Sequence, residues 1–118
     1  EVNKLSAELG NADVELVRKE LGTEFDMIVH EPDGILEIGQ AGHSKASGIE
    51  RLCASLGIAK EDTYAFGDSA NDVEMLEFVA HGIAMGNGTD VAKNAAEFVT
   101  TDIHKDGIWN GLKHYGLI

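Results

Sequence analysis

Two aspartates, Asp68 and Asp72, stand four residues apart in the run GDSAND, directly after the stretch DTYAF at 62–66. In a parallel α/β sheet, ligands bind at the carboxyl ends of strands, so a strand over 62–66 places Asp68 at such an end. Two carboxylates there suit Mg²⁺, a hard cation that prefers oxygen ligands. Asn71 can cap the following helix and offer its amide to a phosphate oxygen. The alternative is that both aspartates only complement a helix dipole, and the strand–loop–helix context favours the metal interpretation over it.

Asp72 is a charged residue on a helix face that is otherwise predicted to be apolar. It lies in the first turn of a helix predicted from Asn71 to about Val79, and Leu76 follows it on the same face. A carboxylate on this apolar, core-facing stripe needs a partner.

Lys45 is a second charged residue in an unusual place. It falls in the first turn of a helix predicted over 44–56, where the helix dipole disfavours a cation. It also precedes Ile49 by four residues and Leu52 by seven, on the stripe that continues to Cys53. A lysine that faces inward there needs an anion as its partner. In the alternative interpretation, the stem lies along apolar surface and the ammonium reaches solvent.

A glycine-rich run, GNGTD at 86–90, joins a predicted strand to a predicted helix. Such loops can expose backbone amides to phosphate. A tight turn with a capped helix start is the preferred interpretation, and Asp106-Gly107 is interpreted in the same way.

The order of predicted elements changes near residue 41. Before it, a strand at 2–7, a helix from Asn11 to Leu21, and strands at 25–31 and 35–39 around a turn at 32–34 give a β-α-β-β order with a mostly antiparallel hairpin. After it, strands and helices alternate, which predicts a parallel sheet and the α/β class. The predicted strands are 62–66, 82–85 and 97–100, and the predicted helices are 44–56, 71–79, 90–95 and 106–115.

The composition excludes some functions. The formal net charge is −12, from 9 basic and 21 acidic residues, which repels nucleic acid and anionic lipid. No run approaches the roughly 18 apolar residues of a membrane span. The single Cys53 cannot form an internal disulfide and is predicted to be a small core residue, which fits a cytoplasmic protein. The chain begins with Glu1, and we expect it to be a piece of a longer one.

Taken in order, these segments resemble the haloacid-dehalogenase superfamily, and most closely its Cof-type sugar-phosphate phosphatases. Lys45 at a helix start is similar to that family's third motif, and GDSAND to its acidic fourth motif, GDxxND. HGIAMGNGTDVAKNAAEFVT resembles the stretch that follows, and ILEIGQAGHSK the exit from an inserted cap. The resemblance implies the C-terminal part of an α/β cap at 1–41, and the C-terminal half of a Rossmann-like core at 42–118.

The resemblance also implies a role for each candidate residue. Lys45 would be catalytic and substrate-binding, steadying the phosphate and the charged nucleophile. Asp68 would bind Mg²⁺ directly, Asp72 would support the metal site, and Asn71 would help to position the phosphate. The parent would hydrolyse small phosphorylated metabolites, such as sugar phosphates, through an aspartyl-phosphate.

The family's nucleophilic aspartate belongs to a DxDGT-like motif that this sequence does not contain. We therefore expect the chain alone to be inactive, and either to associate with itself or to pair with the missing N-terminal part. Two alternatives stay open. GIAMGNGTDVAKNAA also resembles the phosphorylation domain of P-type ion pumps, and a non-catalytic module could keep a metal or phosphate site without turnover.

Overall fold

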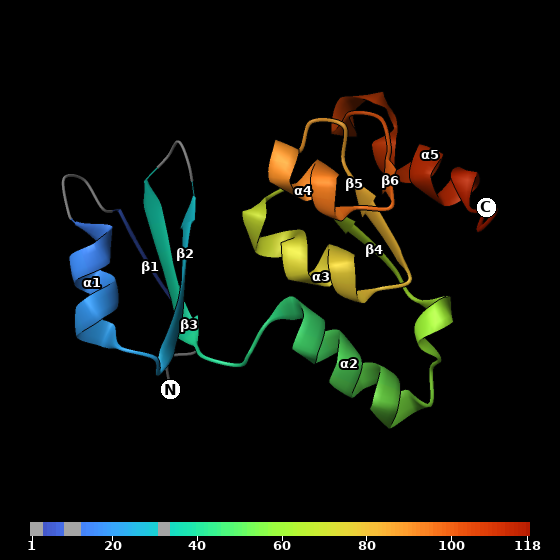
Figure 1. Ribbon diagram of the computed structural model, residues 1–118. Coiled ribbons are helices and arrows are strands. Elements are labelled where there is room, and N and C mark those ends of the chain that lie inside the picture. The colour runs from blue at the N-terminus through green and yellow to red at the C-terminus, as the bar shows by residue number, and fades with distance from the viewer. Residues whose placement is uncertain (1–3, 9–12, 31–33) are drawn as a thin grey trace. The chain divides into compact units, whose positions relative to one another are not determined.

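The computed structural model describes residues 4–8, 13–30 and 34–118, and the chain divides into two compact units, Glu1–His43 and Ser44–Ile118 (Figure 1). In the first unit, the order is β1 (Lys4–Glu8), α1 (Val14–Leu21), β2 (Phe25–His30) and β3 (Ile35–Gln40). The three strands form one antiparallel sheet in the order β1-β3-β2. The predicted β-α-β-β order and the antiparallel hairpin are confirmed.

Capping of α1 differs from the prediction. Asp13, not Asn11, is the N-cap, because its carboxylate accepts the backbone N–H groups of Glu15 and Leu16. Asn11 lies outside the described residues, as do residues 31–33 of the predicted turn. Gly22, with a φ of 66°, ends the helix as expected.

The second unit alternates helices and strands around a parallel sheet in the order β4-β5-β6. The α/β class is therefore confirmed. The elements, in chain order, are α2 (Lys45–Leu56), η1 (Lys60–Asp62), β4 (Tyr64–Gly67), η2 (Ala70–Asp72), α3 (Val73–Phe78), β5 (His81–Ala84), α4 (Asp90–Ala95), β6 (Phe98–Val99), η3 (Ile103–Lys105) and α5 (Gly107–His114).

Several predicted boundaries differ from the structure by one or more residues, and two of the differences have a clear local cause. Strand β4 begins at Tyr64 and not at residue 62, because Thr63 closes a 3₁₀ turn by donating its backbone N–H and its hydroxyl to the carbonyl of Lys60. The predicted helix 71–79 is a 3₁₀ turn over 70–72 followed by α3, and Val79 is already extended.

The core of the second unit lies along β5 and the helices beside it. Ile83 and Ala84 are fully buried, and Leu76 of α3 and Ala92 of α4 pack there at 2% and 0% exposure. These residues hold the carboxyl ends of the strands in a fixed register, with Gly67 opposite Ala84 and Ala84 opposite Val99.

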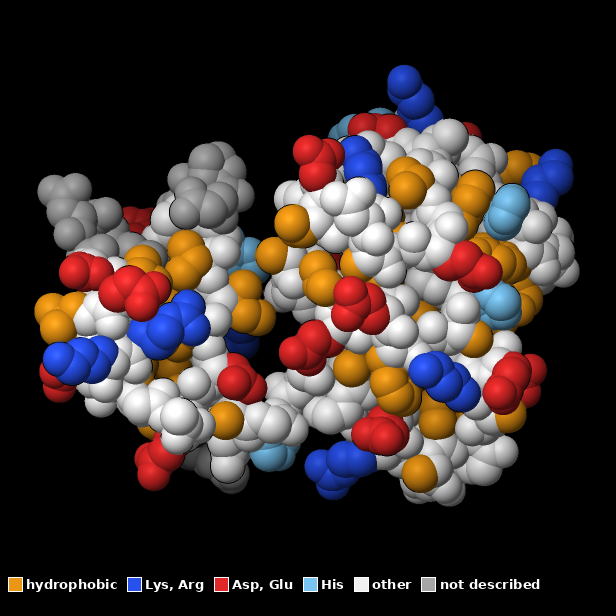
Figure 2. All heavy atoms as spheres, viewed as in Figure 1, with side chains coloured by type: hydrophobic (Ala, Val, Ile, Leu, Met, Phe, Trp, Pro, Cys, Tyr) orange, Lys and Arg blue, Asp and Glu red, His pale blue; other side chains and the backbone are white. Residues whose placement is uncertain are grey.

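Helix α2 keeps its apolar stripe at the surface. It has no buried residue, Leu52 and Leu56 are 57% and 63% exposed, and Cys53 is half-buried instead of lying in the core. Strand β4 is an edge strand with β5 as its one partner among the described strands. Figure 2 shows hydrophobic side chains at the surface of both units. None of the helices within the described ranges is long and apolar enough to cross a membrane.

Candidate functional site

The carboxyl ends of the three parallel strands carry the loops that the sequence singled out. Asp68 follows β4 directly, the GNGTD loop at 86–90 follows β5, and Thr100 follows β6. Because the strands are parallel and in register, the three loops lie at one edge of the sheet, where ligands of such sheets bind.

Asp72 is the centre of the hydrogen bonding at this edge. The residue is 4% exposed. Its Oδ1 forms an ion pair and hydrogen bond with Nζ of Lys45. Its Oδ2 accepts the backbone N–H of Asp68 at 2.9 Å and that of Ser69 at 3.2 Å. The buried carboxylate therefore has the partners that its position requires, and it ties α2 to the loop after β4.

These partners keep Asp72 ionised. Burial by itself raises the pKa of the carboxyl. The hydrogen bond from Lys45 and those from the amides of Asp68 and Ser69 outweigh burial, so the pKa of Asp72 lies below its ordinary value. A charged Asp72 can hold the Lys45 ammonium and the loop at the same time.

Lys45 reaches this site from the first turn of α2. Ser44 caps that helix, and its side-chain oxygen accepts the N–H of Ser47. The Lys45 side chain is 50% exposed, so its ammonium is paired with Asp72 while it remains open to solvent. The sequence predicted an anionic partner for this inward-facing ammonium. It contacts Asp72, whose other oxygen binds the Asp68 amide.

Asp68 and Asn71 keep polar atoms available. Asp68 is exposed, and its carboxylate forms no hydrogen bond or ion pair with another described residue. Asn71 is half-buried, and its Oδ1 accepts the Ser69 hydroxyl at 2.6 Å. It does not cap a helix, since Ser69 stands at the N-cap of η2 and Asp72 at that of α3.

The four predicted site residues therefore differ in how many of their polar atoms are already hydrogen-bonded. Both Asp72 oxygens are committed to Lys45 and to backbone amides. Asp68 presents a free carboxylate, the kind of hard oxygen donor that Mg²⁺ takes with several waters. Among the residues that the structure describes, no group of three or more His, Cys, Asp or Glu side chains could hold a metal. The donor set would fit part of a Mg²⁺ site, in which Asp68 could be a ligand.

The glycine-rich loop does not present a row of free amides. The N–H of Gly86 donates to Thr101 O, that of Gly88 to Met85 O, and that of Thr89 to Asp68 O, at 3.1, 2.8 and 2.8 Å. The predicted tight turn is confirmed, but the predicted cap is not, because Thr89 at the N-cap of α4 makes no side-chain capping hydrogen bond. The contact of Thr89 with Asp68 was not predicted. The glycines at 86 and 88 were a signal that could have indicated it, because glycine often marks a close approach of two backbone segments.

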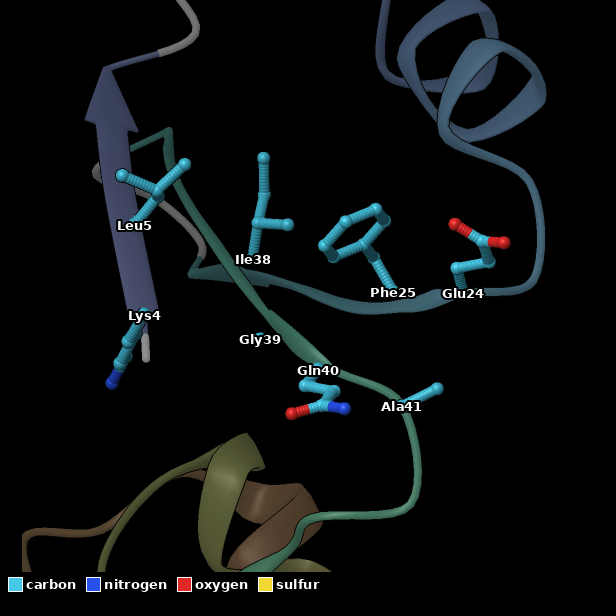
Figure 3. Close-up of a pocket in the computed structure, with 8 residues that line it drawn as sticks. All are labelled: Lys4, Leu5, Glu24, Phe25, Ile38, Gly39, Gln40 and Ala41. Carbon is cyan, nitrogen blue, oxygen red and sulfur yellow. The ribbon is translucent and has the colours of Figure 1, made fainter. Parts of the chain in front are cut away.

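A hollow of about 630 Å³ lies elsewhere, within the first unit. Figure 3 shows Leu5, Phe25 and Ile38 on one side of the sheet and Lys4 directed to the other. Its remaining lining residues are Glu24, Gly39, Gln40 and Ala41. It contains none of the predicted site residues.

The family model of the haloacid dehalogenase-like hydrolases matches residues 1–112, and the chain belongs to this family. One 5-amino-6-(5-phospho-D-ribitylamino)uracil phosphatase of Bacillus subtilis is 42% identical over 84 residues, which are 71% of this chain and 31% of that protein. A phosphatase of the same superfamily from Bacteroides thetaiotaomicron has a TM-score of 0.87 at 28% identity, over 98% of this chain and 42% of that one.

A subclass IIB sugar phosphatase of the superfamily has a TM-score of 0.74 at 35% identity, over 80% of this chain and 36% of that one. The resemblance to the Cof-type phosphatases is thereby confirmed. The chain spans less than half the length of each of these three proteins.

Proposed function

We propose that this chain is the C-terminal part of a Mg²⁺-dependent phosphatase that hydrolyses small phosphate monoesters, such as sugar phosphates. The observation that carries the proposal is the buried Asp72 carboxylate, which holds the Lys45 ammonium on one oxygen and the Asp68 backbone on the other. Residues of the first unit would be the end of a cap, and those of the second the C-terminal half of the catalytic core.

Each residue has a part that its surroundings support. Asp68 would hold the metal, since its carboxylate is exposed and free at the carboxyl end of β4. Bound Mg²⁺ supplies charge neutralisation to the transferring phosphoryl group. Lys45 would bring a second positive charge to the phosphate, and Asp72 would fix its direction. Asn71 would direct its amide N–H groups at a phosphate oxygen.

The reaction also needs a nucleophile that these residues do not supply. In the proposed reaction, a carboxylate oxygen bonds to phosphorus, the ester P–O bond breaks, and the leaving alcohol takes a proton. Water then cleaves the acyl phosphate to regenerate the carboxylate and release phosphate. The chain contributes positioning and charge, which lower the barrier only when a nucleophile is also in place.

Charge, composition and the related proteins bear on the substrate class, the cellular location and the branch of the family. A net charge of −12 disfavours nucleic acid and anionic membranes as partners. The similarity to phosphatases of small phosphorylated molecules supports a phosphorylated metabolite as the substrate. A single unpaired cysteine supports a cytoplasmic location. The similarity to a subclass IIB sugar phosphatase over 80% of this chain supports the sugar-phosphatase branch over the ion-pump branch.

A hybrid enzyme tests the proposal. In it, this chain replaces the segment that it matches in the Bacillus subtilis phosphatase, and hydrolysis of p-nitrophenyl phosphate is followed with and without Mg²⁺. We expect Mg²⁺-dependent turnover, reduced by Asp68→Ala or Lys45→Ala on the order of 10²–10³-fold in kcat. Glu74→Ala, which removes an exposed acid from α3, is the matched control and should leave turnover unchanged.

Three results would count against it. A folded hybrid without turnover would favour the non-catalytic module. Turnover that survives Asp68→Ala would remove Asp68 from the metal site. Turnover by the 118-residue chain alone would reveal a nucleophile that the motifs do not contain.

A further inference from the structure

The backbone of Asp68 is held from two sides. On one side, its N–H donates to Oδ2 of Asp72 at 2.9 Å. On the other, its carbonyl accepts the N–H of Thr89 at 2.8 Å. The approach of the second loop is so close that a Cβ on Gly88 would lie 2.9 Å from the Asp68 carbonyl oxygen and 3.1 Å from its Cα. The direction of the Asp68 side chain therefore depends on where the loop at 86–89 sits.

That loop is fixed in turn by the segment after β6. The N–H of Gly86 donates to Thr101 O at 3.1 Å, and Oδ1 of Asn87 accepts the N–H of Ile103 at 2.9 Å. The segment itself is anchored at the start of α5, where the buried Thr100 hydroxyl donates to Gly107 O at 2.7 Å. Asn87 thus links the loop to a firmly held part of the fold.

We propose that Asn87 is a positioning residue for Asp68. Its side-chain carbonyl keeps the loop at 86–89 against the Asp68 backbone by accepting the Ile103 amide. The inference rests on the proposed function in one respect, namely that Asp68 is the metal ligand. Asn87 itself is exposed, so its substitution leaves the packing around Ile83 intact.

Amide hydrogen exchange, measured by NMR on the 118-residue chain, tests the link without a metal. In Asn87→Ala, loss of one hydrogen bond should speed the exchange of the Ile103 and Thr89 amides by roughly 2- to 10-fold. The amide of His81, which donates to Thr63 O at 3.1 Å in the same sheet, should not change. Asn87→Asp keeps the accepting oxygen and should restore the exchange of both amides.

A Mg²⁺ titration, read from the Asp68 amide resonance, connects positioning to the site. The apparent dissociation constant should rise by a similar 2- to 10-fold in Asn87→Ala and return towards the wild-type value in Asn87→Asp. A wild-type Asp68 resonance that does not respond to Mg²⁺ would refute the metal role in the proposed function, while the exchange result stands by itself.

The positioning role is overturned if Thr89 exchange is unchanged in Asn87→Ala while Ile103 exchange rises. It is also overturned if the His81 amide accelerates as much as the other two, because Asn87 would then act on global stability alone. Failure of Asn87→Asp to restore exchange would likewise exclude the side-chain carbonyl as the cause.

Discussion

Replacing Lys45 with methionine isolates the ion pair on which the site is built. Methionine keeps most of the apolar stem of lysine and removes the ammonium. Asp72, at 4% exposure, would then hold its charge with only the amides of Asp68 and Ser69. We expect the ionised carboxylate to become a net cost to the folded state.

The magnitude follows from how unequally the two partners are buried. Breaking a fully buried pair costs about 3–5 kcal/mol, whereas an exposed pair contributes about 0–1 kcal/mol. The Asp72 side chain is 6% exposed and that of Lys45 is 50% exposed, and two amides remain on the carboxylate. We therefore expect a loss of about 1–3 kcal/mol in unfolding free energy for Lys45→Met. For a domain of this size, that is a fall in Tm on the order of 5–20 °C.

The pKa of Asp72 determines how the stability deficit of Lys45→Met changes with pH. The pKa of Asp72 is depressed in the folded chain, so its stabilising contribution is present above the ordinary value of 3.8 and is lost as pH falls through the lower folded value. In Lys45→Met, burial remains and the hydrogen bond from lysine is gone, so the pKa rises. The deficit of the variant should therefore shrink between pH 7 and pH 4.

Urea unfolding followed by circular dichroism, in a double-mutant cycle with Asp72→Asn, measures the effect. Lys45→Met should cost little in the Asp72→Asn background, where no buried charge remains. Lys105→Met, in an exposed lysine without a described ion pair, is the control and should be near neutral. Equal costs of Lys45→Met in both backgrounds, or no cost in either, would refute the reasoning.

Three further outcomes are expected. Gly88→Ala should lose about 1–3 kcal/mol because its Cβ would meet backbone at 2.9 Å, whereas Gly48→Ala, with nothing within 4 Å, should be neutral or stabilising in the same urea assay. Burial and the hydrogen bond to Glu97 raise the pKa of Tyr115 to about 12, so an absorbance titration should show its phenolate only near that pH. The contribution of this hydrogen bond to folding stability should be present below pH 10 and lost as the pH rises towards 12. The edge strand β4 and the exposed stripe of α2 should make the chain associate with itself in sedimentation velocity, and Leu56→Lys should weaken the association; a wild-type monomer at all concentrations would contradict this.

Much of the fold was accessible from the sequence because its signals are local. Alternating strand and helix patterns after residue 41 predicted the parallel sheet, and helix α4 was predicted with its observed bounds. The predicted bounds of helices and strands were wrong where a side chain forms a hydrogen bond that hydrophobic periodicity does not reveal. Thr63, which closes a turn on Lys60, and Asp13, which caps α1, are such cases.

Charge in an apolar pattern was informative about the site. Asp72 and Lys45 each stood out as a charged residue on a stripe predicted to be buried; the stripe of α2 is exposed, but the structure pairs the two residues. The backbone amides that bind the Asp72 carboxylate were not predictable, because hydrophobic periodicity does not show which N–H groups of the loop reach which oxygen. The contact between Thr89 and Asp68 could not be seen from local patterns either, since the two residues lie 21 positions apart in sequence.

Asp68 is the group on which the proposed chemistry depends most directly. The decisive measurement is kcat/KM of the hybrid phosphatase as a function of Mg²⁺ concentration, for Asp68→Asn against the wild-type chain, at a temperature where both are folded. We predict that Asp68→Asn lowers kcat/KM on the order of 10²-fold or more at every Mg²⁺ concentration, with a Tm close to that of the wild type. Wild-type kcat/KM with an unchanged Mg²⁺ dependence in Asp68→Asn would contradict the assignment of this carboxylate to the metal.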